Sequence, residues 1–171
     1  GLIIDILNAK TMEAVFRLLQ GCSFLGSFLA YQYTIDMNYS PYINFSENDF
    51  VKAGIGAIRG IKKCFLCYGN KCEDAIWYVK EHFNDLLKRY GYTSFHPLPG
   101  HEPTLIDLQN CFCETDKYLR AKMPELRIGN VRIKQKYMPH TDPIQFFFPP
   151  KWNIVEMYKY KPIVVPTLFD L

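Results

Sequence analysis

The residues best suited to chemistry lie in the segment 105–122. Asp107, Asn110 and Glu114 follow one another at steps of three and four residues, which places them on one face of a helix. A carboxylate that faces a substrate can take a proton from it during a reaction. Asp107 and Glu114 are therefore candidate catalytic residues. The alternative interpretation is a solvated helix face, whose carboxylates only cap the helix or contact water.

Asp36 is the third candidate catalytic residue. It lies in the apolar stretch 24–37, four residues after Gln32, so the two side chains share a helix face. A carboxylate in such surroundings needs a partner, or else it serves a function. We predict a cleft where this face, the loop 38–47 and the Asp107–Glu114 face converge, because their polar groups can satisfy one another there.

A second candidate site is the glycine-rich stretch 50–65. Gly54 and Gly56 flank Ile55 in the pattern of a tight turn, with Ile55 expected in the core and a helix expected to begin at Ala57. The N–H groups and the dipole at a helix start can bind phosphate. The pattern is typical of a helix-hairpin-helix motif, which grips a nucleic-acid backbone without reading its sequence. The alternative is an ordinary corner between two helices. The candidate nucleic-acid-binding residues are Lys52, Gly54, Gly56, Arg59, Lys62 and Lys63.

The elements that would position these residues are predicted to be mainly helical. Apolar residues recur at helical spacing, and Gly60 is expected where two helices approach each other closely. Thr11 and Thr104 are expected to cap helices. The expected helices cover 2–19 with a break at 8–11, then 24–37, a short helix from Ser46 to Phe50, a helix from Ala57, a helix from 73 to 90 that Gly91 ends, and 105–122.

The composition changes after Pro124. Alternation over 127–138 predicts a short β-hairpin, with Gly129-Asn130 as its turn. The segment 140–171 is rich in proline and aromatic residues, and we expect it to form an extended tail that wraps the domain. The prediction is thus a helical domain at 1–123, with a hairpin and tail at 124–171 packed on it.

The overall composition favours one intracellular domain. The chain has 171 residues, of which 49% are hydrophobic, and a net charge of only +3, so nucleic-acid binding must depend on a local patch. No apolar run is long enough to span a bilayer. Six cysteines without a secretory signal indicate reduced thiols, as in the cytoplasm or nucleus. Whether the chain is part of a larger protein or complex stays open.

No metal or cofactor is predicted. Cys64 and Cys67 lie inside a predicted helix, and the cysteine spacing fits neither a zinc site nor an iron–sulfur loop. The cysteines are expected to be small buried hydrophobic side chains. His96 and His101 lie in one proline-rich loop and could reach a substrate, although surface histidines are the more common outcome. The sequence contains no P-loop and no dinucleotide-binding fingerprint.

Two blocks of the sequence together resemble one family. They are YQYTIDMNYSPYINFSENDFVKAGIGAIRGIKKCF, from Tyr31 to Phe65, and IDLQNCFCETDKYLR, from Ile106 to Arg120. They look like the α-glutamyl/putrescinyl thymine pyrophosphorylases, also called amino acid:DNA transferases. That family is related to the helical domain joined to 5-hydroxymethyl-dU DNA kinases. The resemblance implies a helical fold like that of the helix-hairpin-helix DNA glycosylases, and it does not extend to the proline-rich C-terminal segment.

The resemblance also implies a reaction on DNA. An amine such as putrescine or an amino acid would replace pyrophosphate on the exocyclic carbon of activated 5-hydroxymethyluracil, so DNA and a small amine or amino acid are the expected partners. The base would first be flipped out of the duplex. Tyr39 would then stack on it, Asn44 or Gln109 would read its pairing edge, and Lys117 would face the pyrophosphate. The candidate substrate-binding residues are Gln32, Asn38, Tyr39, Asn44, Gln109, Asn110 and Lys117.

Three rival interpretations remain at this point. A base-flipping DNA glycosylase would release a free base and needs a catalytic Asp after the hairpin, but Asp107 lies further along the chain than is usual. A non-catalytic DNA-binding module would bind DNA without turnover. A structural protein would have no nucleic-acid partner.

Overall fold

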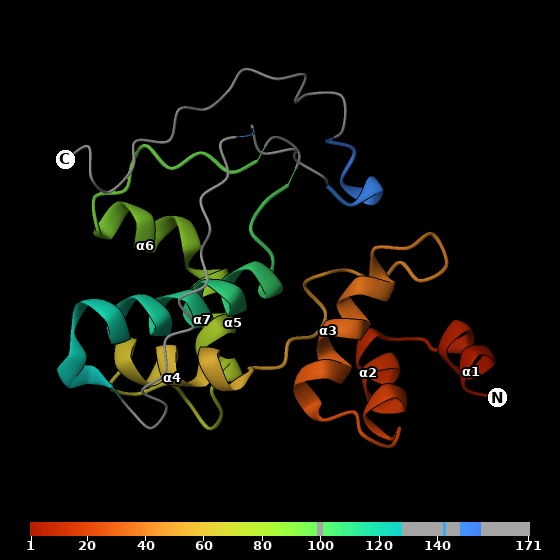
Figure 1. The fold of residues 1–171 in the computed structure, drawn as a ribbon. Coiled ribbons are helices and arrows are strands. Elements are labelled where there is room, and N and C mark those ends of the chain that lie inside the picture. Colours follow the sequence, from red (N-terminus) through yellow and green to blue (C-terminus); the bar gives the residue numbers. More distant parts are fainter. Residues whose placement is uncertain (99–100, 128–141, 143–147, 155–171) are drawn as a thin grey trace.

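The computed structural model describes residues 1–98, 101–127, 142 and 148–154, and this part of the chain is mainly helical, without a β-strand (Figure 1). The prediction of a mainly α fold is therefore confirmed for these residues. None of the described helices is both long and apolar enough to cross a membrane. The elements are α1 (Leu2–Asn8), α2 (Met12–Gln20), α3 (Ser27–Asn38), α4 (Ile55–Cys64), α5 (Glu73–Glu81), α6 (Phe83–Arg89), α7 (Leu105–Lys122) and two 3-10 helices, η1 (Pro124–Leu126) and η2 (Pro150–Trp152).

Helices α4 and α7 lie side by side in the core (Figure 1), and two glycines of α4 allow this close approach. A Cβ atom at Gly60 would lie 2.0 Å from the carbonyl oxygen of Phe112, and one at Gly56 would lie 2.4 Å from Cys113 Sγ. Neither position has room for a side chain. The predicted packing role of Gly60 is confirmed, and Gly56 has the same role rather than forming a turn.

In the N-terminal part of the chain, helices α2 and α3 pack against each other. The predicted break before α2 is confirmed, because the backbone N–H of Ala14 donates to Thr11 Oγ1 over 3.1 Å and so caps the helix. The rings of Phe16, Tyr31 and Phe50 contact one another, with centroids 5.2 to 6.5 Å apart. Phe50 thereby anchors the segment that leads into α4.

The predicted helix from Ser46 to Phe50 is wrong. Residues 47–49 form a turn and residues 50–54 an irregular segment, so no helix directly precedes Gly54. Gly54 is the N-cap of α4, which begins at Ile55, two residues earlier than expected. Ile55 is 67% exposed instead of buried, because the face of α4 that carries Gly56 and Gly60 is the one that meets α7.

The helix expected from 73 to 90 is divided into α5 and α6 at His82, whose φ of −107° and ψ of 18° leave the helical region. Gly91 ends α6 as predicted, with a φ of +79° that suits glycine. The predicted hairpin at 127–138 and most of the tail lie outside the described residues. The domain boundary after residue 123 therefore stays a prediction.

Candidate functional site

The start of α7 is fixed by a capping box that uses Asp107. Asp107 Oδ2 accepts hydrogen bonds from the backbone N–H and from Oγ1 of Thr104, both over 2.8 Å. His101 Nε2 lies 3.2 Å from the same oxygen. A carboxylate so placed satisfies the helix start and faces its positive dipole end. Asp107 therefore has a structural role and also orients the imidazole of His101.

Trp152 joins His101 to a second carboxylate. The indole stacks on the imidazole with a centroid distance of 3.6 Å and an interplanar angle of 22°. Trp152 Nε1 donates to Glu47 Oε2 over 2.8 Å. Glu47 is only 9% exposed, and its other oxygen, Oε1, is buried and accepts no hydrogen bond in the described structure. The pair connects the turn after α3 with the short segment that contains η2.

Tyr39 lies in the same cluster as His101, Glu47 and Trp152. Its ring packs edge-on against Trp152, with centroids 5.8 Å apart. Burial raises the pKa of Tyr39 well above its usual range, and the negative charges of Glu47, Asp107 and Asp36 raise it further. The phenol is thus a neutral hydrogen-bonding group at neutral pH.

The half-buried ammonium of Lys151 lies beside Tyr39 and the 38–45 loop. Lys151 Nζ donates to the carbonyl oxygens of Asn38, over 3.0 Å, and Phe45, over 3.3 Å. It lies 6.0 Å from the centre of the Tyr39 ring. Burial lowers the pKa of Lys151, while the charge of Glu47 opposes this effect. The surroundings of Tyr39 can therefore hold a primary ammonium group.

Asn38 shapes the loop that carries Glu47. Its side chain is buried, donates to the carbonyl of Phe45 over 3.1 Å, and accepts from the N–H of Phe45 over 2.8 Å. The Asn38 side chain thus bonds both backbone groups of Phe45 and holds the two ends of the loop 38–45 together. Asn38 was predicted to bind substrate, but its polar atoms are used by the protein backbone.

Two cavities meet at Trp152. One has a volume of about 450 Å³ and is lined by Asp36, Tyr39 and Ser40 together with Trp152 and its two preceding prolines, Pro149 and Pro150. The other has a volume of about 470 Å³ and its lining includes His96, His101, Asp107, Cys111 and Trp152. The indole is therefore a shared wall. Asp36 and part of the 38–47 loop line one of these cavities and Asp107 lines the other. Asp36 is nevertheless exposed rather than enclosed by apolar side chains, and the predicted convergence with the Asp107–Glu114 face stays a prediction.

Other predicted residues lie elsewhere. Glu114 is exposed and pairs with Lys117 on the surface of α7, nearly two turns beyond Asp107. Asn44 and Asn110 are exposed and Gln32 is half-buried. Gln109 is buried, and its Oε1 accepts no hydrogen bond from the residues that the structure describes. The catalytic and substrate-binding roles assigned to these residues stay predictions, but Glu114 and Lys117 do not line either cavity at Trp152.

The basic residues around α4 also divide into two groups. Lys63 is 3% exposed and bonds Asp116 Oδ1 over 2.6 Å, and Arg120 approaches Asp116 Oδ2 to 3.0 Å. A buried, paired ammonium cannot contact a phosphate, so the predicted DNA-binding role of Lys63 is corrected to a structural one. Lys52 is partly exposed and pairs with Glu73 over 2.6 Å, whereas Lys62 is exposed and Arg59 half-buried.

The helix start at Gly54 retains features suited to an anion. Gly54 has no side-chain cap, and the first turn of α4 contains no acidic residue. The N–H groups of Ile55, Gly56 and Ala57 precede the first intrahelical bond, which Ile58 makes to Gly54. A Cβ at Gly54 would lie 3.3 Å from Gln109 Nε2, so this helix start lies against α7 only two residues beyond Asp107.

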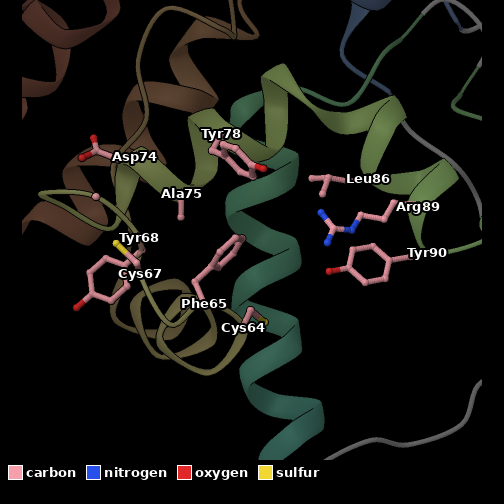
Figure 2. Close-up of a pocket in the computed structure, with 11 residues that line it drawn as sticks. Cys64, Phe65, Cys67, Tyr68, Asp74, Ala75, Tyr78, Leu86, Arg89 and Tyr90 are labelled. Carbon is pink, nitrogen blue, oxygen red and sulfur yellow. The ribbon is translucent and has the colours of Figure 1, made fainter.

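The cysteine prediction is partly wrong. All six cysteines are free thiols, but Cys64, Cys67 and Cys111 are exposed rather than buried. Cys64 and Cys67 line a third cavity of about 480 Å³, between α4, α5 and α6, where Arg89 and Tyr90 face Tyr78 and Phe65 (Figure 2). Asp74 on its rim caps the turn before α5 by accepting from the N–H groups of Asn70 and Lys71. Among the described residues, no group of three or more His, Cys, Asp or Glu is arranged to hold a metal ion.

Sequence reasoning missed Glu47, Trp152 and Lys151 as members of one cluster. Glu47 was expected in the first turn of a helix, and nothing in the local pattern distinguishes Trp152. The role of Asp107 had a readable signal, since Thr104-x-x-Asp107 has the spacing of a capping box.

Comparison with known proteins gives one match. The family model described as "5-hmdU DNA kinase, helical domain" matches residues 1–128. No curated protein and no solved structure matches the chain. The matched span contains Asp36, Tyr39, Glu47, His101 and Asp107, whereas Lys151 and Trp152 lie beyond it.

Proposed function

Since the chain belongs to the family of 5-hmdU DNA kinase helical domains, we propose that it binds DNA and takes part in the modification of 5-hydroxymethyluracil within it. The family match carries this proposal. The start of α4 supports it, because three N–H groups that make no hydrogen bond within the described part of the chain, a helix dipole and the nearby cations Lys52, Arg59 and Lys62 suit a backbone phosphate.

The position of the acidic cluster supports a base-handling role. The start of α4 at Gly54 lies against Gln109, two residues from Asp107. A nucleotide held at Gly54 would therefore have the cluster of Tyr39, Glu47 and His101 within reach of a flipped base. Enzymes that alter a base must remove it from the stack in this way.

We propose further that the reaction is the replacement of pyrophosphate by an amine. The amine nitrogen would attack the exocyclic methylene carbon, the carbon–oxygen bond would break, and pyrophosphate would leave with the bonding electrons. The attacking nitrogen would lose a proton to His101, which Asp107 orients. The ammonium of Lys151 supports the presence of an amine-binding region, because it lies among aromatic and acidic groups there.

The test starts from a duplex that contains one 5-hydroxymethyluracil activated as its pyrophosphate. The duplex is incubated with the protein and putrescine, and the DNA is digested and analysed by mass spectrometry. A retained, enlarged base is expected. A released free base would favour the glycosylase alternative, and salt-dependent binding without any product would favour a non-catalytic module. Absence of DNA binding would contradict the whole proposal.

A further inference from the structure

Trp152 is held as a nucleobase would be held. Its ring is planar and carries one N–H group, it stacks on His101 at 3.6 Å, and its N–H donates to Glu47 over 2.8 Å. Tyr39 packs edge-on against it. Stacking on an aromatic ring combined with one hydrogen bond to a ring N–H is how proteins hold an unstacked base.

The carboxylate of Glu47 can accept more hydrogen bonds than the one that Trp152 donates. The side chain is about nine-tenths buried, since it is 9% exposed. Oε1 has no hydrogen-bond partner at normal bonding distance among the described residues, and the neighbour that acts on this carboxylate besides Trp152 is the Tyr39 hydroxyl. A carboxylate is costly to bury without partners. The loop that carries it is held by the buried side chain of Asn38, so the carboxylate is positioned by the fold rather than by Trp152 alone.

The cavities show where a ligand would fit. Trp152 lines both a cavity that Asp36 and Tyr39 line and a second one that His101 and Asp107 line. Each has a volume of about 450 to 470 Å³, in the range of small-molecule sites, and movement of Trp152 would enlarge both. Trp152 also lies outside the span that matches the family, whereas Tyr39, Glu47 and His101 lie inside it.

We propose that Tyr39, Glu47 and His101 form a site for one unstacked nucleobase with a ring N–H on its pairing edge, and that Trp152 fills this site until the base displaces it. The carboxylate selects bases of the thymine and uracil type through N3–H, or guanine through N1–H. Unprotonated cytosine and adenine present a ring lone pair at that place, which the carboxylate repels. This inference rests on the proposed function, from which it takes DNA as the source of the base.

The first experiment uses Trp152 as the reporter. Trp77→Phe leaves Trp152 as the only tryptophan, since the chain has two. This protein is titrated with thymidine, 5-hydroxymethyl-2′-deoxyuridine and 3-methylthymidine, up to their solubility limits. The two nucleosides with N3–H should shift the emission of Trp152 to the red and increase its quenching by acrylamide, because the indole moves into water. The N3-methylated nucleoside should do neither.

The second experiment removes the internal competitor. Trp152→Ala should bind the two N3–H nucleosides roughly tenfold more tightly than the parent, because the open site no longer has to be freed first. Trp152→Phe keeps an aromatic ring but lacks the N–H, so its affinity should fall between the two. Phe24→Ala alters a fully exposed aromatic residue and should not change the affinity. If Trp152→Ala does not fold, the Phe variant alone still has to bind more tightly than the parent.

Three outcomes would overturn the inference. They are an unchanged Trp152 signal together with no nucleoside binding by Trp152→Ala, equal binding of 3-methylthymidine, or weaker binding after either Trp152 substitution. DNA binding is measured separately on the parent protein. If DNA binds and nucleosides fail to displace Trp152, only this inference fails. If nucleosides displace Trp152 and DNA does not bind, the site stands and the proposed function fails.

Discussion

His101 Nε2 lies 3.2 Å from Asp107 Oδ2, the oxygen that also caps α7 through Thr104. One carboxylate therefore fixes both the start of a core helix and the orientation of an imidazole. This changes how a substitution at Asp107 has to be interpreted. Loss of activity alone would not identify Asp107 as a base, because the same change disturbs the helix start and His101.

Asp107→Asn is expected to lower the free energy of unfolding by about 1 kcal/mol, the usual effect of weakening an N-terminal cap. Thr104→Ser keeps the hydroxyl and the backbone N–H that donate hydrogen bonds to Asp107, and should change stability much less. Urea unfolding of both variants measures the difference. If Asp107→Asn is as stable as the parent, the capping box does not contribute measurably and the carboxylate is held for another purpose.

His101→Gln separates the two roles of that carboxylate. The capping bonds of Thr104 remain in this variant, so its stability should change less than that of Asp107→Asn. Turnover should nevertheless fall by about 10²-fold or more if His101 is the proton acceptor, which is the usual contribution of a general base. Amine transfer measured by mass spectrometry tests this, and full activity of the Gln variant would exclude His101 as the base.

The buried ion pair between α4 and α7 should matter far more than its neighbour on the surface. Lys63→Ala leaves the buried Asp116 with Arg120 as its remaining cationic partner, and should lower the free energy of unfolding by about 1 to 3 kcal/mol. Lys62→Ala removes an exposed lysine from the adjacent position and should change stability by less than about 0.5 kcal/mol. Equal effects of the two substitutions in thermal or urea unfolding would contradict the burial of Lys63.

These residues show what local sequence can and cannot predict. The apolar periodicity of α2, α3 and α7 and the caps at Thr11 and Thr104 are local, and they were predicted correctly. The bond between Trp152 and Glu47 joins positions 105 residues apart, and the bond between Lys63 and Asp116 joins positions 53 apart. No periodicity encodes such contacts. Four lysines and arginines close to a glycine-rich helix start look alike in sequence, although packing buries one of them.

The start of α4 was mispredicted for a related reason. Two glycines around Ile55 suggested a turn, but the actual requirement for Gly56 is a neighbouring helix that approaches within 2.4 Å of where its Cβ would lie. Such a requirement is visible only once α7 is placed. The break at His82 likewise has no glycine or proline to announce it.

The ionisation of Glu73 should make the stability of the fold decrease at acidic pH. Burial alone would raise the pKa of Glu73, but hydrogen bonds from the Lys52 ammonium and the Ala53 N–H outweigh it and hold the pKa below its usual value. A carboxyl whose pKa is lower in the folded state stabilises the fold above its unfolded pKa of about 4.3 and loses this contribution as the pH falls through the folded value. The urea midpoint should therefore fall below pH 4 in the parent and fall less in Glu73→Gln. Parallel curves for the two proteins would contradict this role.

The glycines of α4 provide a graded test of helix packing. Gly60→Ala would place its Cβ 2.0 Å from a backbone carbonyl, whereas Gly56→Ala would meet the side chain of Cys113 and Gly26→Ala would meet nothing within 4 Å. A side chain can move and a backbone in a packed helix cannot without shifting the helix. We expect Gly60→Ala to destabilise by about 3 kcal/mol or more, Gly56→Ala by about 1 to 3 kcal/mol, and Gly26→Ala by little. Thermal unfolding should give this order, and a neutral Gly60→Ala would mean that α4 and α7 lie further apart.

The basic residues near α4 should differ in how much they contribute to DNA binding. Arg59→Ala and Lys62→Ala are each expected to reduce the slope of log affinity against log salt by about 1 if the residue contacts a phosphate, with no change in sequence preference. Lys63→Met keeps the apolar stem of the side chain but removes its charge. In the folded protein this substitution should leave the salt slope unchanged. Fluorescence anisotropy at several salt concentrations measures all three slopes. A slope that falls only with Lys63→Met would mean that the buried lysine opens to contact DNA, and unchanged slopes for Arg59→Ala and Lys62→Ala would place the phosphate contacts away from α4.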